Sequence, residues 1–348
     1  MKIKSIDIAL PSRRMTNEHI INLIREHSAT GFQGDLEATL DRINRMLTLS
    51  GARERRWLAQ GERPIDFVTA AANGALDKAQ LKPEDIDLLI YVGVGKGFIE
   101  PAQSYLVAHA LGWKNTECFD ILDACMSWMR ALQIADSHFR SGRYRNICVV
   151  NAEFVPMEGG PIYPAAYKLN SEEDAEWSFA AYTVGCAASA IILSADNDNI
   201  WDWNFASHPH LADLCTIPIH GWQDYSKSDE NRIGRGGSYR FTSFGGEMHK
   251  HGAPLLIDLF RRSVKQPDQI KAVMTHTSSY REWSKVSRAV GLADRLVCPY
   301  PDYGNLVSAS VPVGLSLELA AGRIKRGDRL AFWVGSAGMS FAVCTFDY

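Results

Sequence analysis

The stretch CFDILDACMSWMRAL, residues 118–132, contains the sequence signals that indicate the fold class. An apolar, strand-like run ends near Ile121, and a helix-like run follows within a few residues. Cys125 lies at the junction. A buried cysteine is most often a small apolar side chain, whereas the unpaired N–H groups at the start of a helix favour the reactive thiolate. Cys125 is therefore either a core residue or a nucleophile.

The alternation of strand and helix extends to both sides of this junction. Residues 65–80 read as a helix with small and apolar residues on one face, and residues 81–95 read as a turn followed by a buried strand. Residues 132–150 continue the helix that starts near Cys125 and run into the next strand. This pattern predicts an α/β fold with a mostly parallel sheet covered by helices.

The second half of the chain repeats the pattern of the first. Residues 266–279 resemble residues 81–95. Residues 315–334 resemble residues 132–150, and each of these last two segments has a Gly-Arg pair at the same place. A chance likeness between short strand–helix segments is the alternative. The constant order of strand, helix and Gly-Arg signals favours an internal duplication.

The duplication divides the chain into an N-terminal half, residues 1–200, and a C-terminal half, residues 201–348. Superposing the halves on their Gly-Arg pairs places Asn305 opposite Cys125. His276 ends a predicted strand of the second half. Ligands of open α/β sheets bind at the carboxyl ends of the strands, so these three side chains are candidates for one site.

Thiol chemistry requires a nucleophile, a base or donor near it, and an orienting amide. Cys125, His276 and Asn305 supply these groups, and Gly304 allows a tight turn before the asparagine. Taken singly, a histidine at a strand end is more often structural, and an asparagine after glycine is more often a turn residue. Their related places in a duplicated chain favour a shared site.

Composition excludes several classes of function. The net charge of −3 gives no reason to expect nucleic acid as a partner. Seven cysteines are scattered without CxxC spacing, so neither a zinc site nor a disulfide framework is expected, and a cytoplasmic location fits best. No apolar run reaches the length of a membrane span. The histidines of HPH (208–210) and HKH (249–251) are expected to be exposed loop residues rather than metal ligands.

Several motifs together resemble the β-ketoacyl-acyl-carrier-protein synthase III family of the thiolase superfamily. They occur in the family's order along the chain: GARERRWLA, DILDACMSWMRAL, THTSS, YGNLVSASVP and GSAGMSFAV. The resemblance implies a five-layered αβαβα fold and a homodimer. It also implies substrates that are acyl-coenzyme A or acyl-carrier-protein thioesters, with no resident cofactor.

The resemblance also assigns roles to individual residues. Cys125 takes the acyl group from a thioester, and His276 and Asn305 stabilise the enolate and the thioester oxygen during a Claisen condensation. The backbone N–H groups of Cys125 and Gly338 match the family's oxyanion hole. Arg281 matches a basic residue that contacts the carrier, although a solvated charge on a helix is an equal alternative.

Other positions depart from the housekeeping members of the family. Arg45 and Leu49 stand where those enzymes have a tryptophan and an arginine against the coenzyme A adenine. Residues 97–107 and 180–193 look more like the olefin-pathway enzymes that join two acyl thioesters head to head. In that branch a glutamate acts as base across the dimer interface, and Glu100 matches it. A surface acid before a turn proline is the alternative for Glu100.

The expected function is therefore formation of a C–C bond through an acyl-cysteine, in fatty-acid or related secondary-metabolite biosynthesis. Condensation with or without loss of CO₂ stays open. One alternative is an acyltransferase on the same scaffold that passes the acyl group to an alcohol or amine. A non-catalytic partner subunit is another.

Overall fold

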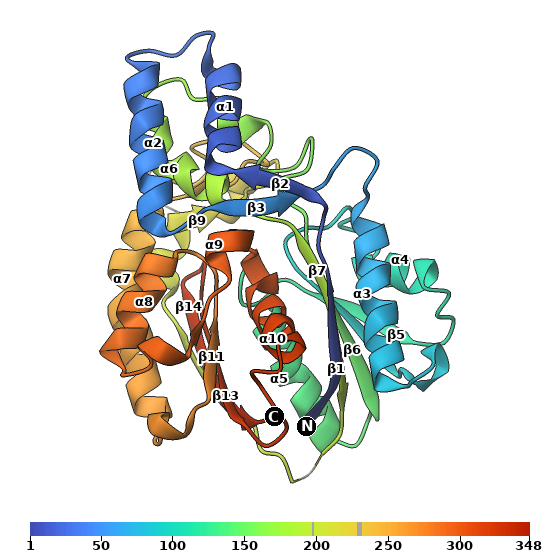
Figure 1. Ribbon diagram of the computed structural model, residues 1–348. Coiled ribbons are helices and arrows are strands. Elements are labelled where there is room, and N and C mark those ends of the chain that lie inside the picture. Colours follow the sequence, from blue (N-terminus) through green and yellow to red (C-terminus); the bar gives the residue numbers. More distant parts are fainter. Residues whose placement is uncertain (197, 228–231) are drawn as a thin grey trace.

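The computed structural model describes residues 1–196, 198–227 and 232–348, and its strands form two five-stranded sheets (Figure 1). The first sheet has the order β1-β7-β6-β4-β5 and consists of β1 (Lys2–Ala9), β4 (Leu88–Val92), β5 (Glu117–Ile121), β6 (Asn146–Glu153) and β7 (Ala187–Ser194). The second has the order β12-β11-β13-β14-β8 and consists of β8 (Asp202–Ser207), β11 (Ala272–Thr275), β12 (Leu296–Val297), β13 (Arg329–Ser336) and β14 (Ser340–Asp347).

The two sheets have one topology. β4 runs parallel to β5 and β6, just as β11 runs parallel to β12 and β13. β7 is antiparallel to β6 and β1, just as β14 is antiparallel to β13 and β8. Each strand of the first sheet thus has a counterpart in the second. The predicted division between residues 200 and 201 falls in the connection from β7 to β8.

The helices complete five layers (Figure 1). One pair covers the outer face of the first sheet, a second pair lies between the sheets, and a third covers the outer face of the second sheet. The pair on the first sheet is α3 (Pro64–Ala79) with α4 (Gln103–Ala110). The pair between the sheets is α5 (Ser127–Arg140) with α10 (Ser310–Ala320), and the pair on the second sheet is α7 (Gly245–Ser263) with α8 (Tyr280–Ala289).

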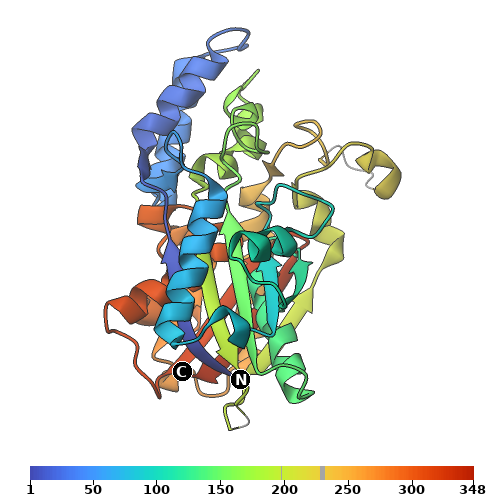
Figure 2. The ribbon, with the colours of Figure 1, turned by 90° about the vertical axis from the view of Figure 1, so that its right-hand side faces the viewer.

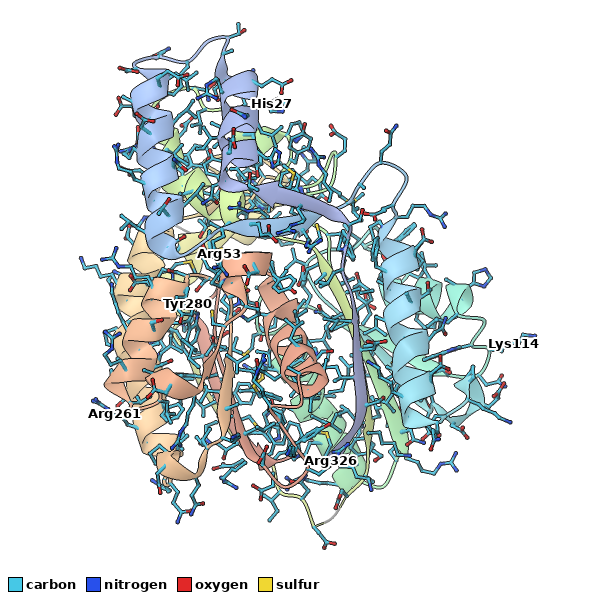
Figure 3. All side chains as sticks on the ribbon, viewed as in Figure 1. His27, Arg53, Lys114, Arg261, Tyr280 and Arg326 are labelled. Atoms are coloured by element: carbon cyan, nitrogen blue, oxygen red, sulfur yellow. The ribbon has the colours of Figure 1, made fainter. Side chains whose placement is uncertain are left out.

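Side chains fill the space between the layers (Figure 3). β4 and β7 are buried along their whole length, which explains their continuous apolar sequences. One buried cluster joins the facing surfaces of both sheets through α5, where Trp128 packs edge-on against Phe332 of β13. The two halves therefore share a core.

A cap of shorter elements lies over the carboxyl ends of the parallel strands, and part of it projects from the body (Figure 2). It comprises α1 (Asn17–Ser28), α2 (Leu36–Ser50), α6 (Asp174–Ser178), α9 (Tyr300–Tyr303), the β2 (Arg13–Thr16) and β3 (Glu54–Trp57) hairpin, and the β9 (Cys215–Thr216) and β10 (Thr242–Ser243) pair. Asp35 caps the start of α2, and Gly51 ends it in the left-handed conformation beside Tyr280, which Figure 3 labels.

No helix in the described ranges is long and apolar enough to cross a membrane. The described residues also contain no group of three or more His, Cys, Asp or Glu side chains placed to hold a metal ion.

Candidate active site

The carboxyl ends of strands from both sheets border one cavity of about 640 Å³. Most of its walls are apolar side chains. They come from α2, from the cap segment at residues 155–184, from β9 and β10, and from one face of α7. Its lining also includes Cys125, His276, Asn305, Ser336 and Ala337. The three side chains predicted to share a site thus line one cavity.

Cys125 follows β5 in a short loop that leads into α5. The preceding Ala124 has a φ of 45°, an unusual backbone conformation for a residue with a Cβ. Ser127 fixes the loop, because its hydroxyl accepts the N–H of Asp123 at 2.8 Å and donates to the carbonyl of Ala124 at 2.7 Å. The loop directs the thiol into the cavity.

The start of α5 does not by itself keep Cys125 as a thiolate. Burial raises the pKa of the Cys125 thiol well above its ordinary value, and the neighbouring Cys215 and Glu153 raise it further. The backbone N–H groups of Ala337 and Cys125 hydrogen-bond the sulfur and offset part of this effect. Cys125 is therefore a neutral thiol near pH 7, and its use as a nucleophile requires a base.

The second N–H at the sulfur belongs to Ala337, the residue before Gly338, which the resemblance implies as a donor of the oxyanion hole. Ala337 follows β13 directly and lines the cavity, whereas Gly338 is not part of the described lining. Gly338 has a φ of 118° and a cis peptide bond to Met339. The donors at the sulfur are Cys125 and Ala337, and the oxyanion-hole role of Gly338 stays a prediction.

His276 follows β11 and is almost fully buried. Its Nδ1 lies 3.1 Å from the carbonyl oxygen of Val307 and 3.1 Å from Oγ of Ser310. Because the carbonyl can only accept, Nδ1 carries the proton and Nε2 keeps its lone pair. Burial lowers the pKa of His276 to about 4, so the ring is neutral near pH 7 and can accept a proton at Nε2.

Asn305 is held by backbone on both sides. Its N–H donates to the carbonyl of Thr183 at 2.8 Å, and its carbonyl accepts from Gly185 at 3.0 Å. Its side-chain Oδ1 accepts the N–H of Val307 at 2.9 Å, which leaves the amide NH₂ to donate. Gly304, with a φ of 69°, permits this close approach, as predicted for the turn.

The cavity opens to the surface between α2 and α8, at the mouth formed by Met46, Leu49 and Arg281. Arg281 is half-exposed there and lies 3.9 Å from Glu282. Arg45 is exposed and is not among the described lining residues. The mouth therefore presents apolar side chains beside one cation.

Glu100 lies on the surface, in the loop after β4, and does not line the cavity of its own chain. Its peptide bond to Pro101 is cis. The structure thus separates Glu100 from Cys125, His276 and Asn305 within one chain.

Three further residues of the site were not identified from the sequence. Glu153, the last residue of β6, is fully buried near Cys125. Cys215 is a second thiol lining the cavity. His249, expected in an exposed loop, instead lies on α7 and lines the cavity, where burial lowers its pKa. The apolar periodicity of residues 248–256 was the available signal for His249, since it places that residue on the buried face of a helix.

The buried carboxyl of Glu153 gives a testable effect on stability. Burial raises its pKa from 4.5 to about 7, so its contribution to stability is complete below pH 4.5 and is lost as pH rises through 7. The difference corresponds to about 3 kcal/mol. Between pH 5 and pH 8, urea unfolding should therefore show a steeper loss of stability for the wild type than for Glu153→Gln, by about 2–3 kcal/mol.

His276 acts in the opposite direction, because its lowered pKa favours the fold above pH 6.5. That effect is common to both proteins and cancels in the comparison. Equal pH slopes for the two proteins would contradict the assignment of a raised pKa to Glu153.

Comparison with known proteins finds similarity to the β-ketoacyl-[acyl-carrier-protein] synthase III enzymes. A family model described as 3-oxoacyl-[acyl-carrier-protein] synthase III C terminal matches residues 260–348, which include His276, Asn305 and Ala337. The β-ketoacyl-[acyl-carrier-protein] synthase III of Aliarcobacter butzleri is 27% identical over 326 residues, covering 90% of this chain and 92% of the relative. That of Aquifex aeolicus is 25% identical over 322 residues, covering 90% and 94%.

Solved structures share the fold over the whole chain. An OleA variant of Xanthomonas campestris, crystallised with lauric acid and lauroyl-CoA, has a TM-score of 0.82 at 21% identity, covering 99% of this chain and 98% of that one. The synthase III of Aquifex aeolicus has a TM-score of 0.79 at 22% identity, covering 100% and 99%. The predicted thiolase-like fold is confirmed.

Proposed function

We propose that this chain, a relative of the β-ketoacyl-acyl-carrier-protein synthase III enzymes, is a condensing enzyme that forms a C–C bond through an acyl-Cys125 intermediate. One observation carries the proposal. A thiol with two N–H donors, a neutral imidazole with a free lone pair and an amide donor border the same apolar cavity. These groups are what a Claisen condensation between thioesters requires.

Acylation uses the thiol and the imidazole. His276 Nε2 takes the proton of Cys125, and the sulfur attacks the thioester carbonyl. The N–H groups of Cys125 and Ala337 stabilise the oxyanion of the tetrahedral intermediate, as preorganised donors do. When the intermediate collapses, the C–S bond of the substrate breaks and the leaving thiolate takes the proton from His276.

Condensation uses the amide. The enolate of a second thioester forms by loss of CO₂ or by removal of an α-proton, and Asn305 donates to its oxygen. The enolate carbon then attacks the carbonyl of acyl-Cys125. The bond to sulfur breaks, and the Cys125 thiolate recovers a proton from solvent when CO₂ is lost, or from the base that removed the α-proton in the other route.

The mouth is where the carrier portion of the thioester would lie. Arg281 is the cation available there to a phosphate of coenzyme A or to an acidic carrier protein. Met46 and Leu49 supply apolar contacts in place of an adenine sandwich. Acyl-coenzyme A and acyl-carrier-protein thioesters are therefore the proposed substrates.

A homodimer would complete the site. Leu122 lines the cavity, yet 60% of its surface is exposed, so the cavity wall reaches the surface there. It follows β5, the open edge strand of the first sheet, beside the loop after β4 that carries Phe98, Ile99 and Glu100. A second copy packed on this apolar edge would cover Leu122 and bring its own Glu100 toward the cavity.

Mass spectrometry of the intact protein tests the function. Incubation with a panel of acyl-coenzyme A thioesters should add one acyl mass per chain, located on Cys125. A β-keto product, formed with or without a malonyl thioester, would support condensation. An ester or amide with an added acceptor would instead support an acyltransferase, and absence of any adduct across short and long chains would contradict both.

Glu100→Gln separates the two routes to the enolate. If an α-proton is removed, this variant should still acquire the acyl group but should lose condensation by about 100-fold, because a positioned base contributes about 10²–10⁴-fold. Single-turnover measurements of acylation and of product formation check the expectation. Unchanged condensation by Glu100→Gln would show that the partner carboxylate is not the base and would favour loss of CO₂.

A further inference from the structure

Val307 connects His276, which serves acylation, with Asn305, which serves condensation. Its N–H donates to Oδ1 of Asn305 at 2.9 Å, and its carbonyl accepts from Nδ1 of His276 at 3.1 Å. Its φ is 49°, in the left-handed region that β-branched residues rarely adopt. Such a conformation persists only where surrounding contacts hold it.

The next residue, Ser308, supplies those contacts through two buried side chains of β6. Its N–H donates to Oε1 of Glu153 at 3.3 Å, and its hydroxyl donates to the same oxygen. The hydroxyl oxygen in turn accepts from Nδ2 of Asn151 at 2.7 Å. Glu153 and Asn151 are both fully buried, so no water competes for these bonds.

Glu153 also holds the loop after β4. Its Oε2 accepts the N–H groups of Val94 and Gly95, each at 3.2 Å. Every hydrogen bond recorded for this carboxylate is donated by an N–H or O–H group. The donors lie on two loops, one in each half of the chain. Burying a carboxylate costs free energy of folding, and an apolar side chain of similar size often packs equally well in its place. The carboxylate is therefore best explained by the groups that it positions.

We propose that Glu153 and Ser308 act as a clamp that holds Val307 in its left-handed conformation and thereby positions Asn305 for condensation. Both are positioning residues, since neither lines the cavity. The inference deepens the proposed function and rests on it. The N–H donors at the sulfur, from Cys125 and Ala337, lie outside the clamp.

Ser308→Ala tests the clamp by separating the two half-reactions. Without the hydroxyl, Val307 can relax, and a misplacement of catalytic groups by about 1 Å costs about 100-fold in rate. We expect kcat for condensation to fall by roughly that factor with KM nearly unchanged. Acylation of Cys125, followed by mass spectrometry in a single turnover, should stay within about threefold. It does not use Asn305, and His276 keeps its second contact, from Nδ1 to Oγ of Ser310 at 3.1 Å.

Ser189→Ala is the matched control. Ser189 is also a buried serine, on β7, but its hydroxyl has no hydrogen-bond partner among the described residues. Its removal should leave both half-reactions unchanged. Ser308→Thr keeps the hydroxyl and should recover most of the condensation activity that Ser308→Ala loses.

The pH profile supplies a readout that general loss of structure would not produce. Three titratable side chains, Tyr91, Cys125 and Cys186, face Glu153 from neighbouring elements, and none is cationic. Burial raises the pKa of Glu153 to about 7, and protonation would replace one acceptor by a donor. Wild-type condensation should fall as pH drops below about 7, whereas acylation should not, and Glu153→Gln should lack this limb.

A crystal structure of Ser308→Ala provides a test that needs no activity. Loss of the bonds from Val307 to His276 and Asn305 would support the clamp even if the wild type proved unable to condense. An unchanged φ at Val307 with both bonds intact would overturn it. Equal losses of acylation and condensation in Ser308→Ala would also overturn it, whereas a wild type with no acyl adduct would contradict only the proposed function.

Discussion

Cys125→Ala should form no acyl adduct and should lose turnover by about 10⁴-fold or more, the largest effect expected of any single substitution. Loss of a catalytic nucleophile removes the covalent route entirely, and only binding and electrostatic effects remain. The N–H donors of Cys125 and Ala337 stay in place because both belong to the backbone. Intact mass after incubation with acyl-coenzyme A, together with product formation under saturating substrate, measures the loss.

Cys215→Ala is the control for this experiment. Cys215 lines the same cavity, and burial raises the pKa of its thiol to about 11, so it is a second buried sulfur in the same environment. Its recorded hydrogen-bonding neighbour is the side chain of Ser243, with no backbone N–H pair like that at Cys125. The variant should keep the adduct. An adduct that persists in Cys125→Ala and disappears in Cys215→Ala would assign the nucleophile to Cys215.

Gly304→Ala should cost at least about 3 kcal/mol of stability and about 100-fold in condensation. A Cβ at this position would lie 2.2 Å from the carbonyl oxygen of Thr183 and 3.0 Å from Cβ of Arg55. That same carbonyl accepts the N–H of Asn305, so relieving the clash moves the asparagine. Urea unfolding and the condensation rate of the folded fraction check the two parts of the expectation.

Gly322→Ala is matched to Gly304→Ala in φ but not in surroundings. The φ values are 67° and 69°, whereas nothing lies within 4 Å of a Cβ built on Gly322. Its alanine variant should lose only about 1 kcal/mol, the cost of a left-handed conformation, and should condense normally. Similar losses in the two variants would show that the close approach to Thr183 is not what Gly304 permits.

The duplication could be predicted from sequence because it depends on order along the chain. Strand, helix and Gly-Arg signals recur at the same relative places, and the two sheets have the same connectivity. The placement of Cys125, His276 and Asn305 followed from a general rule, since the carboxyl ends of parallel strands meet at one edge of a sheet. Local pattern and topology sufficed for these features.

Prediction failed where the property depends on burial. The place of Cys125 before α5 favours a thiolate, but desolvation outweighs the two N–H groups at the sulfur. Glu153 was not predicted as a site residue, because one acid at the end of an apolar strand is no distinctive signal. His249 was expected in an exposed loop, because the sequence before it is rich in glycine. Instead, α7 begins at Gly245 and includes His249.

The sequence by itself therefore determined the α/β class, the two halves and the three side chains Cys125, His276 and Asn305 that share the cavity. Tertiary structure alone decided the ionisation states of the thiol and the imidazole, the N–H of Ala337 as a donor to the sulfur, and the link from Glu153 through Ser308 to Val307. The physical reason is that desolvation and hydrogen bonding depend on which distant segments pack together. Glu153 and Ser308 are separated by 155 residues along the chain and meet only when the two halves are joined.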